Sequence, residues 1–112
     1  MISIACNIQE CYFEIIKKHF TSKDFYLEKF NPASYDDIYF IEINTLNDLD
    51  KIHQINRYPE TLIYIIGPND FHLLNECLTL GIHLYFEKDD LENSLHSKSE
   101  TIHQQIFTRF KT

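Results

Sequence analysis

Two short runs of β-branched and aromatic residues constrain the fold of this chain most strongly. Ile38–Ile43 reads IYFIEI and Leu62–Ile66 reads LIYII. Strands that are apolar on both faces are typical of the middle of a parallel sheet that helices cover on both sides. Between the two runs, apolar residues recur at helical spacing and predict a helix: Leu46, Leu49, Ile52 and Ile55.

The rest of the chain continues this alternation of strands and helices. Further strands are predicted at Ile2–Cys6, at Phe25–Phe30 as a more polar edge, and at His83–Phe86. Helices are predicted at Gln9–Phe20, after an Asn69 or Asp70 cap, and after an Asp89 or Asp90 cap. Gly81 is expected to end the second of these helices. Their core-facing residues are expected to be Tyr12, Ile15, Ile16, His19 and Phe20 in the first, Phe71, Leu74, Cys77 and Leu78 in the second, and Leu91, Leu95, Ile102 and Ile106 in the last.

The order β-α-β-β-α-β-α-β-α predicts one α/β domain over residues 1–112, with a doubly wound parallel five-stranded sheet in three layers. One connection is short for a parallel crossover, because only Asn31–Asp37 separates the second strand from the third. Seven extended residues span at most ~25 Å, which suffices to cross one strand. We therefore expect an extended loop there, with the helix shortened or lost. The alternative is that these two strands are not both parallel members of the sheet.

Composition limits the functions that this domain can have. The net charge of −7 argues against direct contact with nucleic acid or with an anionic membrane. No apolar run approaches the ~20 residues of a membrane span, and no signal peptide is recognisable, so we expect a cytoplasmic protein. The three cysteines form no CxxC pair and the six histidines are scattered, so we expect neither a metal site nor a cofactor.

The predicted carboxyl ends of the strands carry the residues with most functional interest: Cys6, Asn7, Ile8, Gln9, Glu42, Ile66, Gly67 and Lys88. Together with the stretches Tyr35–Ile43 and Leu62–Asp90, this set resembles the receiver domains of bacterial response regulators. The resemblance is closest to the receivers of LytTR-type transcriptional regulators. It implies a flavodoxin- or CheY-like fold and a part in two-component signal transduction.

The departures from the family pattern imply that the phosphorylation site is degenerate. Asn7, Ile8 and Gln9 stand where the family has the acidic residues that hold Mg²⁺, which phosphoryl transfer requires. Glu42 replaces the phosphoacceptor Asp, and Ile66 replaces the switch Thr or Ser. Lys88 alone keeps its family type, and we expect it to form a fixed ion pair with Glu42.

The resemblance therefore predicts a pseudo-receiver, which is a regulatory and interaction module and not an enzyme. Its partner would be another protein or a second copy of itself, and its output would be transcription through an attached or separate DNA-binding domain. Tyr85, Phe107 and Phe110 are candidate interface residues. The alternative for Phe107 and Phe110 is closure over the domain's own core, and the alternative for Tyr85 is an edge aromatic that packs against the last helix. Two further alternatives are a phosphoacceptor receiver that uses Glu42 or a nearby Asp, and a phosphocysteine carrier that uses Cys6.

Overall fold

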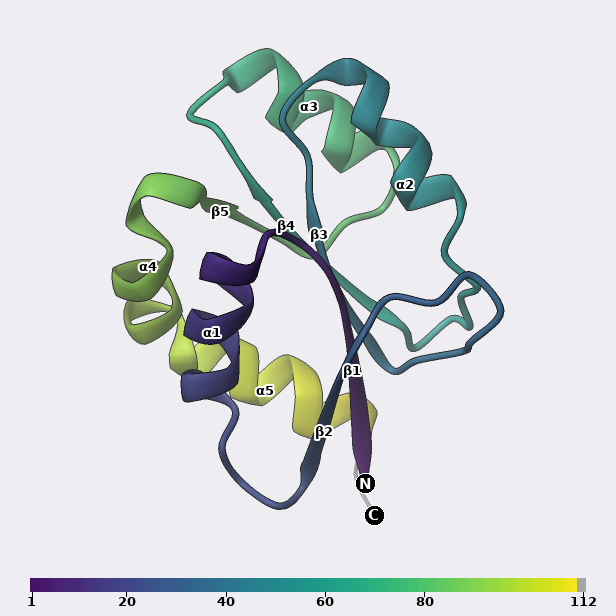
Figure 1. Ribbon diagram of the computed structural model, residues 1–112, viewed down its shortest axis with the longest axis vertical. Coiled ribbons are helices and arrows are strands. Elements are labelled where there is room, and N and C mark those ends of the chain that lie inside the picture. The colour runs from purple at the N-terminus through teal and green to yellow at the C-terminus, as the bar shows by residue number, and fades with distance from the viewer. Residues whose placement is uncertain (111–112) are drawn as a thin grey trace.

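The computed structural model describes residues 1–110, which form five strands and five α-helices (Figure 1). The strands are β1 (Ile2–Asn7), β2 (Phe25–Lys29), β3 (Ile38–Glu42), β4 (Leu62–Gly67) and β5 (Leu84–Glu87). The helices are α1 (Glu10–His19), α2 (Asp50–His53), α3 (Phe71–Thr79), α4 (Leu91–Ser97) and α5 (Ser99–Arg109). A 3₁₀ turn over Leu46–Leu49 leads into α2. None of the helices in this described part is long and apolar enough to cross a membrane.

All strand pairs are parallel and the strand order is β2-β1-β3-β4-β5. The predicted doubly wound α/β sheet is therefore confirmed, with β2 as an edge strand. The chain winds outward from β1 to β2 and then returns to β3, so the order reverses between β1 and β3. In open parallel sheets such a reversal creates a crevice outside the carboxyl ends of the two strands. Asn7 and Glu42 end these two strands.

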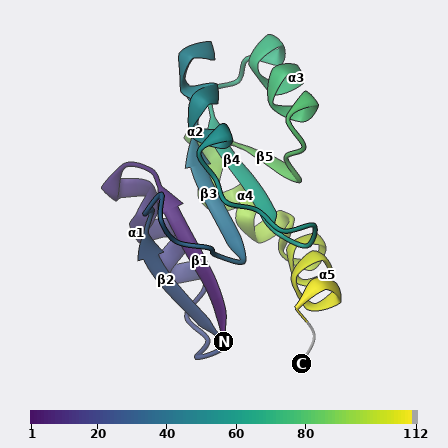
Figure 2. The same cartoon turned by 90° about the vertical axis from the view of Figure 1, so that its right-hand side faces the viewer.

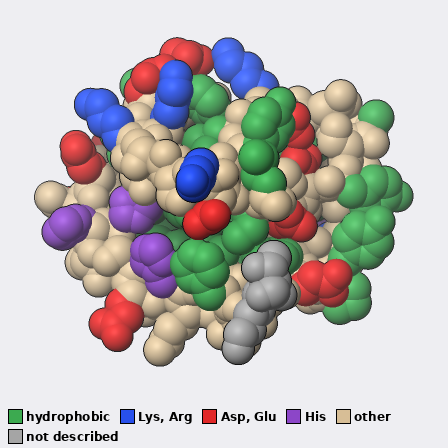
Figure 3. Space-filling view, turned by 90° about the horizontal axis from the view of Figure 1, so that it is seen from below, with side chains coloured by type: hydrophobic (Ala, Val, Ile, Leu, Met, Phe, Trp, Pro, Cys, Tyr) green, Lys and Arg blue, Asp and Glu red, His purple; other side chains and the backbone are tan. Residues whose placement is uncertain are grey.

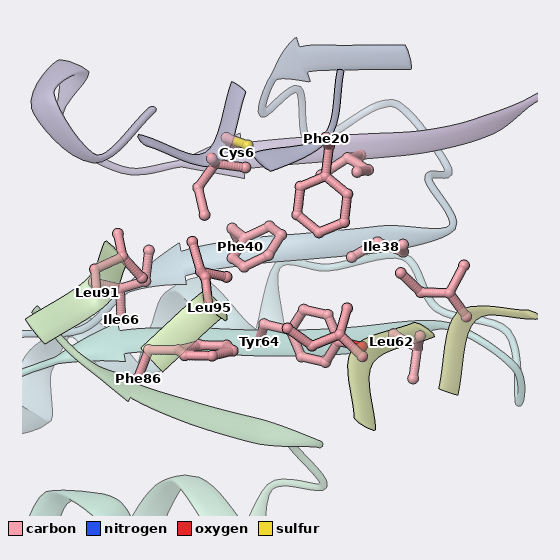
Figure 4. Close-up of a cluster of buried hydrophobic side chains, with 14 of the residues drawn as sticks. Cys6, Phe20, Ile38, Phe40, Leu62, Tyr64, Ile66, Phe86, Leu91 and Leu95 are labelled. Carbon is pink, nitrogen blue, oxygen red and sulfur yellow. The ribbon is translucent and has the colours of Figure 1, made fainter. Parts of the chain in front are cut away.

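The hydrophobic core has two layers, one on each face of the sheet. Helices α1, α4 and α5 cover the first layer, where Phe40 packs against Phe20, Tyr64 and Phe86 (Figure 4). Helices α2 and α3 lie over the second layer on the opposite face (Figures 1 and 2). Alternate residues of β3 and β4 enter the two layers, which explains why both strands are apolar throughout.

The connection from β2 to β3 is an extended segment without a helix, as the short spacing predicted. We call residues 30–37 the crossing loop, because this segment runs from the end of β2 across β1 to the start of β3 (Figure 2). Its Asp37 carboxylate accepts hydrogen bonds from the backbone N–H and the hydroxyl of Ser3, at 3.0 and 3.3 Å. The Asn56 side chain donates to two carbonyls of the loop.

Some side-chain orientations differ from the predictions. Phe71 and Leu78 of α3 are exposed, whereas Leu73 and Cys77 are buried, because Asp70 caps the helix and sets Leu73 and Cys77 one turn apart toward the core. Leu46 is exposed because the chain there forms a 3₁₀ turn, whose three-residue period differs from that of an α-helix.

The last predicted helix is two helices, α4 and α5, which meet at Lys98. All four of its predicted core residues are nevertheless buried: Leu91, Leu95, Ile102 and Ile106. The break leaves the buried apolar residues in place because it falls between Leu91 and Leu95 of α4 on one side and Ile102 and Ile106 of α5 on the other. Gly81 adopts a φ of 81° just after α3, as its predicted role in ending that helix requires.

Candidate functional site

The structure brings the predicted residues of β1 and β3 together at the carboxyl edge of the sheet. Glu42 is only 4% exposed, although it is charged and lies at the end of a strand. Gln9 lies opposite it, as the residue that precedes helix α1. Because a buried carboxylate is costly unless it is paired or hydrogen-bonded, the partners of Glu42 decide what this site does.

Three hydrogen bonds surround the Glu42 carboxylate. One oxygen accepts from the Gln9 backbone N–H at 2.9 Å. The other accepts from the side-chain amide of Gln9 at 2.6 Å and from that of Asn44 at 2.9 Å. Both oxygens are thus satisfied by neutral donors, and the backbone donor sits at the start of α1, where helix geometry leaves N–H groups free.

The environment holds Glu42 in its ionised form. Burial acts to raise its pKa, but the hydrogen bonds from Asn44 and Gln9, with a smaller contribution from the charge of Lys51, leave the pKa lowered overall. Lys51 also donates to the backbone carbonyl of Glu42 at 3.1 Å. The site is therefore a fixed anion held within the protein, with its acceptor atoms already occupied.

The predicted direct ion pair between Glu42 and Lys88 is wrong, because Asn44 lies between them. The Lys88 ammonium donates to the Asn44 side-chain carbonyl at 2.8 Å, and the amide end of the same side chain donates to Glu42. The two ion pairs found among residues 1–110 join Lys29 to Glu10 and Lys51 to Asp48. The Asn44 side chain therefore links the two charged groups without a direct contact between them.

This bridge makes a clear prediction for Lys88. Replacing it by Met removes a single exposed hydrogen bond, so we expect a loss of less than about 1 kcal/mol in the free energy of unfolding. Urea denaturation of Lys88→Met beside the parent protein measures it. A loss comparable to that of removing Glu42 itself would show that the two charges are directly coupled.

The positions that would hold Mg²⁺ in a receiver offer no carboxylate. Asn7 is half-buried at the end of β1, and Ile8 packs against the first core layer. Ile66, which the resemblance puts at the switch position, is fully buried in the same layer and pairs in register with Glu42. Within residues 1–110 there is no group of three or more His, Cys, Asp or Glu placed to hold a metal ion.

Tyr85 points inward and is fixed by a hydrogen bond. Its hydroxyl donates to the Pro68 carbonyl at 2.6 Å, and its ring packs beside the second core layer. Burial, with smaller effects from Cys77, Asp70 and Glu87, raises the pKa of Tyr85 to about 12. Gly67 makes room for it, because a Cβ there would contact the Tyr85 hydroxyl and lie 2.7 Å from the Ile43 carbonyl oxygen.

Sequence reasoning missed Asn44 as a member of the site, and it placed Gly67 at the functional edge of the sheet without predicting the close approach of Tyr85. The signal for Gly67 was available, since a glycine at a strand end often marks a close approach of other atoms. Asn44 carried no comparable signal, because a polar residue after a strand is usually a solvated loop residue.

Cys6 is buried in the first core layer, in contrast to the exposed Cys11. Burial, and to a lesser extent the charge of Asp36, raises the pKa of the Cys6 thiol to about 12. A thiol in that state is protonated near neutral pH and is a poor nucleophile. These properties argue against the phosphocysteine-carrier alternative.

The two cysteines give an internal comparison for this conclusion. We expect iodoacetamide near neutral pH to alkylate Cys11 quickly, while Cys6 reacts only as fast as the protein opens. Mass spectrometry of peptides at successive times follows both sites in one sample. Modification of Cys6 ahead of Cys11 would restore Cys6 as a candidate nucleophile.

A groove with a volume of about 300 Å³ lies between the start of α3, strand β5 and helix α4. Phe71 stands at this groove and is 76% exposed. Charged side chains line it as well: Asp70, Glu87, Asp90 and Lys98. Tyr85, whose hydroxyl donates to the Pro68 carbonyl, also forms part of the wall of this groove.

The other two predicted interface residues lie near the end of the chain. Phe107 is 43% exposed and stacks on the His103 ring, with 5.5 Å between the ring centroids. Phe110 is partly buried and packs against the first core layer. Histidines gather on this side of the molecule (Figure 3), and burial followed by the charges of His103 and His96 lowers the pKa of His19.

Comparison with known proteins finds the fold but no family. No family model matches the sequence, and no curated protein matches it. A pilus assembly protein CpaE from Caulobacter crescentus superposes with a TM-score of 0.64 at 14% identity, over 91% of this chain and 99% of that one. A Sinorhizobium meliloti structure described as pilus assembly protein CpaE2 gives 0.57 at 15% identity, over 85% and 98%.

A response regulator protein from Burkholderia multivorans superposes with a TM-score of 0.61 at 13% identity, over 92% of this chain and 96% of that one. The chain therefore has the flavodoxin-like fold of receiver domains, as the fold prediction stated.

Proposed function

We propose that this chain is a phosphorylation-independent receiver-like module that acts through protein contacts and has no enzymatic activity of its own. The observation that carries the proposal is the state of Glu42, which fills the phosphoacceptor position with a buried carboxylate whose two oxygens already accept three hydrogen bonds. An acceptor must instead present a free oxygen to the phosphoryl group beside a metal ion. The receiver-like fold of the similar structures supports the signalling role.

The first test is exposure of the purified chain to acetyl phosphate with Mg²⁺, read by intact mass. We expect no phosphoryl adduct and no Mg²⁺-dependent change in thermal unfolding. Glu42→Asp sharpens the test, because it restores the acceptor type of the family while Asn7, Ile8 and Gln9 still supply no carboxylate for the metal. We expect this variant to stay unmodified too. A stoichiometric adduct on the parent chain would favour the phosphoacceptor alternative.

We place the partner-binding face on the groove between α3, β5 and α4. The exposed Phe71 ring offers an apolar anchor, and three carboxylates against one ammonium make the groove acidic. Because complementary charge guides association, the preferred partner carries basic residues around an apolar side chain. A second copy of a chain with a net charge of −7 is less well matched, although Phe107 and Phe110 keep a homodimer as a testable form.

Sedimentation velocity at low and high salt tests the homodimer. A monomer at both salt concentrations would favour a separate partner. A dimer that Phe107→Ser dissociates and Phe71→Ser leaves intact would move the interface to α5.

We propose a bacterial cytoplasmic location and control of transcription through an attached or partner DNA-binding domain, in line with the LytTR-like sequence pattern. Assembly of a protein machine is the second candidate output, because two of the similar structures are pilus assembly proteins. The two outputs differ in their partners. Cross-linking in cells followed by identification of the captured proteins separates a DNA-binding partner from a component of a pilus assembly complex.

A further inference from the structure

His83 lies just before strand β5 and binds one residue of β4 through two hydrogen bonds. Its backbone N–H donates to the Ile63 carbonyl at 2.8 Å, and its ring atom Nδ1 accepts the Ile63 backbone N–H at 3.0 Å. Pairing in register begins one residue later, at Tyr64 and Leu84. The imidazole therefore extends the contact between β4 and β5 by one residue, with a side-chain nitrogen in the place of a backbone acceptor.

The turn after α3 explains why a side chain is used there. In a parallel pair of strands, the N–H and the carbonyl of one residue bond to two residues that lie two positions apart on the neighbouring strand. The partner of the Ile63 N–H would then be Gly81, but Gly81 adopts a φ of 81° and ends α3. Ile63 is fully buried, so its N–H needs another acceptor, and Nδ1 of His83 supplies one.

This hydrogen bond fixes the protonation state of the ring. A backbone N–H can only donate, so Nδ1 must carry a free lone pair and the ring proton must lie on Nε2. A protonated imidazole has an N–H group at both nitrogens and cannot accept from Ile63. The bond between His83 and Ile63 therefore exists only while the imidazole is neutral.

The surroundings of His83 favour that neutral form. The ring is partly exposed, so a proton from solvent can reach it. The charged groups that act on it are Arg109, at the end of α5, and Arg57, in the segment between α2 and β4, and both are positive. Burial first, and then these two charges, lowers the pKa of His83 below the ordinary 6.5.

We propose that His83 is an acid-sensitive clip, which fastens the start of β5 to β4 while its imidazole is neutral and releases it when a proton from solvent binds to Nδ1. The lone pair that accepted the Ile63 N–H then forms the new N–H bond, so two donors face each other and the ring has to turn away. Because β5 is an edge strand whose single strand neighbour is β4, the start of β5 loosens.

The direction of the pH dependence follows from the lowered pKa. The folded protein favours the neutral ring more than the unfolded chain does. The stabilisation from the clip is therefore fully present above the unfolded value of 6.5 and is lost as the pH falls through the lower folded value. Strand β5 also forms one wall of the groove described above. A link between acidity and partner binding rests on the proposed function, whereas the clip itself does not.

Nuclear magnetic resonance on the full chain tests the clip without any partner. Histidine ¹⁵N spectra should place the ring proton of neutral His83 on Nε2, with a titration midpoint below 6.5. Hydrogen exchange followed through the same titration reports the release, because the Ile63 and His83 amides both belong to the clip. We expect their protection, corrected for the intrinsic exchange rate, to fall about tenfold on acidification, as for the loss of one hydrogen bond, while amides in the centre of β3 keep theirs.

Three variants separate the clip from other effects of acid. In His83→Asn the side-chain oxygen can accept from Ile63 at a reach similar to that of Nδ1 and does not titrate, so protection should not depend on the protonation of residue 83. His83→Leu has no acceptor and should show the low protection at every pH. His72→Asn, which removes an exposed histidine of α3, should retain the tenfold fall.

Four results would overturn the clip. They are a ring proton on Nδ1 of neutral His83, unchanged protection of the Ile63 amide through the titration, an equal acid-dependent fall in His83→Asn, and a fall of the β3 amides in parallel with that of Ile63. The last would mean that acid acts on the whole fold and not on the start of β5. None of these results bears on whether the chain is a phosphorylation-independent module, so the two proposals can fail separately.

Discussion

Gly67→Ala is expected to destabilise the protein by about 3 kcal/mol, near the upper end of the range for overpacking a buried site. The backbone of Gly67 needs no unusual φ, so the effect comes from space alone. A Cβ would overlap the Tyr85 hydroxyl and approach the Ile43 carbonyl oxygen to 2.7 Å. The Tyr85 side chain can rotate away, but the Ile43 carbonyl oxygen belongs to the backbone and moves only if the chain itself shifts. Urea denaturation measures the loss.

The double variant separates the two contacts. Tyr85→Phe removes the hydroxyl that meets the new Cβ, so Gly67→Ala should cost less in the Tyr85→Phe background than alone. The recovery should be partial, because the contacts with the Ile43 carbonyl oxygen at 2.7 Å and with the ring carbon Cζ at 2.9 Å remain. If the two losses simply add, Tyr85 already leaves its inward position when Cβ is present. That result would indicate that the hydrogen bond to Pro68 holds the ring only weakly.

The parallel sheet could be predicted because its evidence is local. Strands β3 and β4 are apolar on both faces, and only the centre of a helix-covered sheet accommodates such segments. The loss of the helix between β2 and β3 followed from chain length. Helix orientation was less predictable: Phe71 fits an apolar stripe, yet it lies in the first turn of α3, and the cap at Asp70 turns that residue outward.

Some members of the site could be predicted, but Asn44 and the contacts within the site could not. Glu42 and Lys88 were expected at the same carboxyl edge of the sheet, and they lie there at the ends of β3 and β5, with β4 between the two strands. Two strand spacings of about 4.8 Å separate β3 from β5, so the two side chains do not meet directly and the Asn44 amide links them. Asp36 gave no signal at all, since Asp-Asp before a strand has the composition of a solvated turn, and only the fold of the crossing loop buries it.

Removing the carboxylate at Glu42 is the second change with a large expected effect. In Glu42→Leu, the Gln9 backbone N–H and two side-chain amides lose their acceptor at once, and we expect a loss of about 3 kcal/mol in the free energy of unfolding. Glu42→Gln should cost less, about 1–2 kcal/mol. The side-chain carbonyl of the new Gln can still accept a hydrogen bond, whereas its NH₂ group faces an N–H donor and cannot accept from it. Chemical denaturation of both variants near neutral pH gives the two values.

The pH dependence distinguishes lost charge from lost shape. Because the pKa of Glu42 is lowered in the folded protein, its stabilisation is present above the unfolded value of 4.5 and is lost as the pH falls through the lower folded value. The parent protein should therefore lose stability more steeply on acidification than Glu42→Gln, and their difference should vanish at the acid end. Asp48→Asn is the matched control, since its carboxylate also has a lowered pKa, from the Asn44 backbone hydrogen bond foremost, but lies outside the strand. A difference between parent and Glu42→Gln that stays constant with pH would mean that Glu42 supports the fold by its shape alone, and would remove the buried anion on which the pseudo-receiver proposal rests.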